Sequence, residues 1–142
     1  MGEARSAIDG HTRRIVLLDS AALVEDGDKG QIIVTGSHGA LAGRDPRMAL
    51  RVDGFAAVFN DAGFGADNAG VGRLEALDAR EIAASTVAAA TARIGEAASS
   101  FHHGVISAAD NTALKLGAKI DARASDLLRA WADRPEQQGG FR

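Results

Sequence analysis

Short apolar runs alternate with longer amphipathic stretches along most of the chain. The runs Ile15–Leu18, Ile32–Val34 and Phe55–Phe59 are continuous and are bounded by charged, polar or glycine residues. A short continuous apolar run of this kind is typical of a strand that is buried on both faces. We interpret Ile82–Val87 as a fourth strand, and a single alanine-rich helix over residues 78–98 is the competing interpretation.

Helix signals fill the intervals after the second and third runs. Asp45 followed by Pro46 is typical of an N-cap and a first helical position, so a short helix is predicted from there to about Arg51. Asp67 or Asn68 can cap a second helix, whose leucines then repeat at helical spacing on one face.

Two further helices are predicted in the C-terminal third. Apolar residues repeat at helical spacing from Ser99 to Leu116, and Gly117 is the expected C-terminal stop. The last helix is expected over Ile120–Trp131, with Asp121 as its cap.

The alternation of strands and helices predicts one α/β domain over residues 13–134. We expect a small Rossmann-like three-layer sandwich with a largely parallel sheet of about four strands. The 13 residues at 19–31 are close to the minimum length for a parallel crossover. A hairpin between the first two strands, which would make the sheet mixed, is therefore the alternative. Residues 1–12 are expected to be a flexible lead, and residues 135–142 a disordered tail.

Composition argues against several classes of function. A net charge of -3 and the scarcity of aromatic residues disfavour nucleic acid as a partner. The chain has no cysteine, so thiolate nucleophiles, disulfides and cysteine-bound zinc are excluded. No apolar stretch approaches the roughly 20 residues of a membrane span, and no secretory signal is visible. We therefore expect no membrane partner and a cytoplasmic location.

Small residues predict self-association. The chain has 17 glycines, and alanine is its most frequent residue, so each side chain contributes little buried area. Burial against a second copy is a common remedy for a thin core. We therefore expect a homo-oligomer.

The first candidate for chemistry follows the second apolar run. Glycine amides and hydroxyl groups at a strand end can donate hydrogen bonds to a carboxylate or phosphate. The histidine among them titrates near neutrality and can act as an acid or stabilise an oxyanion. The alternative is a glycine-rich turn whose hydroxyls satisfy their own backbone. The candidates for anion binding are Thr35, Gly36, Ser37 and Gly39, and the catalytic candidate is His38.

The second candidate follows the third apolar run. Asp61 is the expected general base, because a carboxylate at a strand end can be tuned by burial or by a nearby histidine. Asn60 is its expected neutral partner in binding substrate, and an Asx turn is the alternative interpretation. Gly63 and Gly65 begin a dinucleotide fingerprint, but the third glycine position is Asn68. We therefore expect no cofactor.

The remaining candidates are single residues near the same edge of the sheet. Asp19 and Ser20 end the first run, and Arg93 follows the fourth run in a stretch of small residues. Arginine binds carboxylate or phosphate in a bidentate manner, and a surface salt bridge is the alternative interpretation of Arg93. His102 and His103 lie at the start of the predicted long helix, and adjacent side chains diverge, so no metal site is expected.

Three functions are compatible with these residues. The favoured hypothesis is a hydrolase- or lyase-type enzyme that acts by acid–base chemistry on a small anionic metabolite at the C-terminal edge of the sheet. The second is a ligand-binding or regulatory module that uses the same residues without turnover. The third is a structural subunit of a hetero-oligomer.

Overall fold

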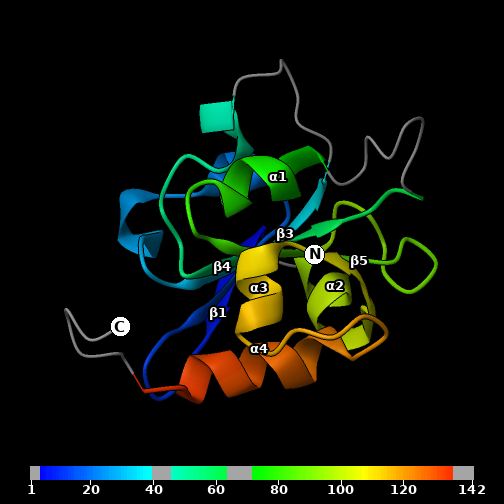
Figure 1. The fold of residues 1–142 in the computed structure, drawn as a ribbon. Helices are drawn as coiled ribbons and strands as arrows, with labels where there is room; N and C mark the ends of the chain where they lie inside the picture. Colours follow the sequence, from blue (N-terminus) through cyan, green and yellow to red (C-terminus); the bar gives the residue numbers. More distant parts are fainter. Residues whose placement is uncertain (1–3, 40–45, 64–71, 136–142) are drawn as a thin grey trace.

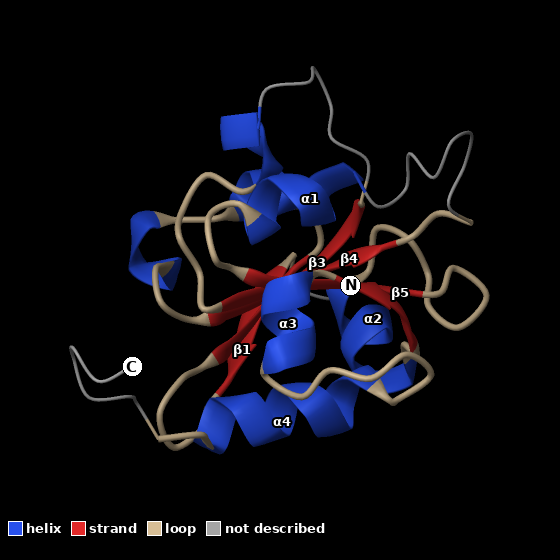
Figure 2. Ribbon diagram, in the orientation of Figure 1, coloured by secondary structure: helices blue, strands red, loops and turns tan. Residues whose placement is uncertain are grey.

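The computed structural model describes residues 4–39, 46–63 and 72–135, which form a six-stranded sheet with helices on both faces (Figures 1 and 2). The strands lie in sequence order from β1 to β6, and the four central ones run parallel. An antiparallel strand closes each edge. The strands are β1 (Arg5–Ile8), β2 (Ile15–Leu18), β3 (Ile32–His38), β4 (Ala56–Asn60), β5 (Ala83–Val87) and β6 (Ile106–Ala109).

The predicted α/β class and the largely parallel sheet are confirmed, and the sheet is larger than expected. All four apolar runs form strands, so the helical interpretation of residues 78–98 is wrong. The short segment after β2 makes a parallel crossover rather than a hairpin, because it coils into two 3-10 turns, η1 (Ala21–Leu23) and η2 (Asp26–Asp28). Strand β1 lies within the segment expected to be a lead, and it makes the sheet mixed at that edge.

One face of the sheet carries all the parallel crossovers. Because β2 to β5 follow one another in order and such connections are right-handed, each crossover must pass on the same side. The layer on this side contains η1, η4 (Pro46–Ala49) and α1 (Gly72–Asp78). Phe59, Leu74 and Leu77 are buried between this layer and the sheet.

The opposite face is covered by α2 (Ala97–His103) and α4 (Ala124–Asp133), as Figure 1 shows. Phe101 of α2 and Leu128 of α4 are fully buried there. One layer packs on each face of the sheet, and with the sheet itself these layers make up the predicted three-layer arrangement. No helix among the described residues is long and apolar enough to cross a bilayer.

The long helix predicted over Ser99–Leu116 is wrong, because three elements occupy its place. α2 ends at His103, β6 follows, and α3 (Asn111–Lys115) begins after Asp110. The Asp110 carboxylate accepts a hydrogen bond from the Ala113 amide and so caps α3. The cap of the last helix is also corrected: Arg123, not Asp121, precedes α4.

Some expectations fall on residues that the structure does not describe. The predicted helix after Asp45 is the 3-10 turn η4, and Asp45 itself lies outside the described residues. The caps expected at Asp67 or Asn68 and the tail over 136–142 also lie outside them. The flexibility of the lead and the homo-oligomer stay predictions.

Candidate functional site

The parallel order of β2 to β5 brings the polar ends of these strands to one edge of the sheet. His38 at the end of β3 lies opposite Asn60 at the end of β4. Asp61 follows directly, and its amide donates to the Val87 carbonyl at the end of β5. The C-terminal edge of a parallel sheet is where α/β proteins bind their ligands, so this edge is the candidate site.

Asn60 is fully buried and connects three segments of this edge. Its Nδ2 donates to the Ala92 carbonyl at 3.1 Å, and its Oδ1 accepts from the Ala62 amide at 2.8 Å. Its own carbonyl accepts from the Gly39 amide at 2.8 Å. Asn60 therefore fixes the chain that follows β5 against the ends of β3 and β4.

Asp61, the next residue, also holds this edge together. Its Oδ1 accepts from the Gly63 amide at 2.7 Å and from the Ala89 amide at 3.0 Å. The side chain completes an Asx turn, and both Ala62 and Gly63 have positive φ, at 51° and 77°. The residue is only 2% exposed. The Asx turn considered from the sequence is therefore present, together with a tether to the segment after β5.

Gly36 is in close contact with the chain that leads into α2. A Cβ on Gly36 would lie 2.5 Å from the Glu96 nitrogen and 2.6 Å from the Asp19 carbonyl oxygen. The Gly36 carbonyl accepts from the Gly95 amide at 2.7 Å, and Asp19 Oδ1 accepts from the Ala97 amide at 3.0 Å. The glycine and the aspartate thus hold the start of α2 against β2 and β3.

The hydroxyl groups of Thr35, Ser37 and Ser20 are also used within the fold. Thr35 is fully buried, and its Oγ1 donates to the Val58 carbonyl. Ser37 Oγ accepts from the Ala21 amide, and Ser20 Oγ accepts from the amide two residues later at the start of η1. These groups hold strand ends and turns in place.

Two basic side chains, those of His38 and Arg73, lie near the ends of β3 and β4. His38 is exposed at the end of β3. Arg73 of α1 is not among the residues predicted from the sequence, yet its amide donates to the Gly39 carbonyl and its guanidinium carbon lies 5.0 Å from the Phe59 ring centre. It also donates to the Ala49 carbonyl, and burial lowers its pKa. Nothing in its sequence context, a polar position of an amphipathic helix, indicates a role at this edge of the sheet.

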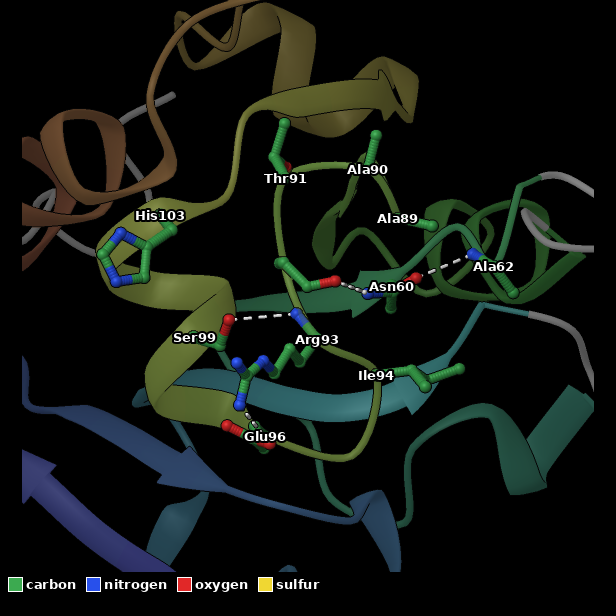
Figure 3. A pocket seen from close by; sticks show the side chains of 11 residues that line it. Asn60, Ala62, Ala89, Ala90, Thr91, Arg93, Ile94, Glu96, Ser99 and His103 are labelled. Atoms are coloured by element: carbon green, nitrogen blue, oxygen red, sulfur yellow. Dashed lines mark hydrogen bonds and ion pairs between the residues drawn. The ribbon is translucent and has the colours of Figure 1, made fainter.

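A pocket of about 790 Å³ opens beyond the ends of β4 and β5 (Figure 3). This volume falls within the range of roughly 300–1,000 Å³ that is usual for small-molecule sites. Its walls come from the end of β4, from the loop over residues 88–96 (the 88–96 loop) and from α2. It is lined by Asn60, Ala62, Ala89, Ala90, Thr91, Ala92, Arg93, Ile94, Glu96, Ser99 and His103.

The pocket has an apolar side and a charged side. Figure 3 shows the side chains of Ala89 and Ile94 on one side, and Arg93, Glu96 and His103 on the other. The Arg93 side chain is 81% exposed and its Nη1 lies 3.8 Å from Glu96 Oε2. The lining of the pocket therefore includes a guanidinium, a carboxylate and an imidazole.

Only two of the predicted site residues line this pocket, namely Asn60 and Arg93. Sequence reasoning missed Glu96, Ser99 and His103, because it extended one helix from about Ser99 to Leu116 and assigned the paired histidines only to the start of that helix. The pair instead ends α2, whose first residues follow the 88–96 loop directly. The one feature of the sequence that pointed to this loop was Arg93 in a stretch of small residues.

No protein-family model, curated protein or solved structure matches the chain. Across the described ranges, no three histidine, aspartate or glutamate side chains gather closely enough to hold a metal ion. The chemistry of the site is therefore argued from the pocket itself.

Proposed function

We propose that this chain binds a small metabolite carrying a carboxylate or phosphate, and that Arg93 is its main anchor. The observation that carries the proposal is the arginine Arg93, with an 81% exposed side chain, in the lining of a pocket at the C-terminal edge of a parallel sheet. Arginine pairs with carboxylate and phosphate through two parallel hydrogen bonds, which gives both strength and orientation.

The rigidity of the 88–96 loop supports the proposal. Asn60 and Asp61 hold the loop from β4, Gly36 holds it from β3, and Ser99 Oγ accepts from the Arg93 amide at 2.9 Å. A binding wall that is fixed in advance loses little conformational entropy when a ligand arrives. The hydrogen bonds of the strand ends thus prepare the pocket rather than contact the ligand.

Replacing Arg93 with glutamine is expected to weaken ligand binding about tenfold, the loss typical of a charge-assisted pair. Thermal unfolding would be followed with inorganic phosphate and with small carboxylates, with and without an α-amino group. A ligand at 100 times its Kd stabilises the folded state by about 2.7 kcal/mol, which is a readily measured shift in Tm.

Arg123→Gln is the matched control, because Arg123 is exposed and lies outside the pocket. It removes the same charge and should leave every ligand-induced shift unchanged. The proposal is contradicted when no probe raises Tm, or when Arg93→Gln responds as strongly as the wild type.

Acid–base catalysis at the same edge is the second candidate function. It is favoured by the position of His38, which is exposed and lies opposite Asn60 on the neighbouring strand. Asn60 is followed directly by the buried Asp61. In this hydrolase- or lyase-type scheme Asp61 is the base and His38 the acid or oxyanion stabiliser.

Asp61→Asn separates the two functions. Asparagine keeps an oxygen that can accept from the Gly63 and Ala89 amides, so the loop and the binding of ligand should survive. A catalytic carboxylate, in contrast, cannot be replaced by an amide, and turnover should fall at least about a hundredfold. Unchanged turnover of a substrate found by screening would exclude Asp61 as the base.

A further inference from the structure

Arg93 and Glu96 present opposite charges to the same pocket. The Nη1–Oε2 distance is 3.8 Å, and the two side chains are 81% and 54% exposed. A hydrogen bond between such groups requires about 2.7–3.2 Å, so the two charges are close without being tightly paired. Exposed pairs of this kind contribute little to stability, so a ligand can insert between them at little cost.

We propose that the ligand is zwitterionic, namely an α-amino acid with an aliphatic side chain, and this inference rests on the proposed function of the pocket. The carboxylate of such a ligand would pair with Arg93, and its ammonium group with Glu96. The four charges then alternate in sign around a ring, so that every neighbouring pair attracts.

A simple carboxylate lacks this complementarity. Arg93 would attract its single negative charge, and the nearby carboxylate of Glu96 would repel it, because like charges repel at short range. The carboxylate of Glu96 is therefore the group that selects between an anion and a zwitterion. Its side chain makes no capping hydrogen bond to α2 among the described residues, which leaves it available to a ligand.

The apolar side of the pocket suits the rest of such a ligand. Ala62, Ala89, Ala90 and Ile94 line it opposite the charged side (Figure 3). The small alanine side chains leave room for a ligand. Ile94 is 53% exposed, so an aliphatic ligand side chain that covers it removes apolar surface from water. A polar ligand body would gain nothing from these contacts.

L-leucine and 4-methylpentanoate are the probes that test this inference, because they differ only in the α-amino group. Isothermal titration of the wild type is expected to give a Kd for L-leucine at least about fivefold below that for 4-methylpentanoate. Glu96→Gln should weaken L-leucine about fivefold and strengthen 4-methylpentanoate by a similar factor. Glu75→Gln, at an exposed position of α1, is the matched control for loss of a negative charge and should change neither Kd.

The outcomes separate this inference from the function on which it rests. If 4-methylpentanoate binds as tightly as L-leucine and both depend on Arg93, the anion pocket stands and the zwitterion is refuted. An unchanged affinity of Glu96→Gln for L-leucine also refutes it. If neither probe binds the wild type, the amino-acid inference fails, and the phosphate and other carboxylate probes decide the anion pocket separately. An unaltered Tm of Glu96→Gln without ligand shows that the variant is folded.

Discussion

Replacing Gly36 with alanine is expected to destabilise the protein by about 3 kcal/mol or more, at the upper end of what overpacking costs. The new Cβ would lie 2.5 Å from two atoms of the Gly95–Glu96 segment and 2.6 Å from the Asp19 carbonyl oxygen. All of these are backbone atoms, so no side chain can swing away to relieve the contact. Urea unfolding at neutral pH measures the change.

The same substitution is expected to move the 88–96 loop, since Gly36 also accepts the hydrogen bond from Gly95. Gly27→Ala is the control, because a Cβ built there has no described atom within 4 Å other than those of its own turn. Gly27 lies in the turn η2, and its substitution should be neutral or slightly stabilising. Equal unfolding free energies for the two variants would contradict the packing account.

Replacing Asp28 with asparagine is expected to destabilise the protein by about 2–3 kcal/mol, because it breaks a buried charged pair. The Asp28 side chain is fully buried and accepts from both terminal nitrogens of Arg5, at 2.7 and 2.9 Å. It also accepts from the Glu25 amide and so holds η2 together. Strand β1 is thereby attached to the crossover between β2 and β3.

The effect of this substitution should depend on pH. The hydrogen bonds from Arg5 lower the pKa of Asp28, against the opposing effect of burial. A carboxyl group with a lowered pKa stabilises the fold above its unfolded value of about 3.9, and this stabilisation is lost as pH falls through the folded pKa. The difference between wild type and Asp28→Asn should therefore be constant near pH 6–7 and shrink below about pH 4.

Asp53→Asn is the control for the buried pair. Asp53 pairs with Arg80 at the same 2.7 Å, but its side chain is 66% exposed. Exposed pairs contribute about 1 kcal/mol or less, so this variant should change little. A loss at Asp53 as large as the loss at Asp28 would show that burial does not decide the strength of these pairs.

The central strands were predictable because their sequences agree with their surroundings. Ile15–Leu18 and Ile32–Val34 are covered on both faces of the sheet, and a continuous apolar run is the pattern typical of such a strand. The edge strands carry no such signal. Arg5–Ile8 is half exposed, and Ile106–Ala109 consists mainly of small residues that also suit a helix. Tertiary pairing decided their structure.

The meeting of polar strand ends at one edge of the sheet was predictable, because parallel strands end on the same side, whereas the roles of these residues were only partly visible. Serine, threonine, asparagine and aspartate at a strand end can bind a ligand or their own backbone, and the sequence does not distinguish the two. Thr35 and Asn60 are buried and bonded within the fold. The groups open to a ligand, Arg93 and Glu96, belong to a loop whose course only the folded chain defines.

Mapping the backbone amides of the wild type by NMR during titration with L-leucine and with phosphate tests the central claim most directly. We expect the changes in chemical shift to concentrate over residues 89–96 and at His103. In Arg93→Gln the same changes should require about tenfold more ligand. Changes confined to the smaller charged hollow beside Lys29 and Arg51, or no changes at all, would contradict a ligand site at the C-terminal edge of the sheet.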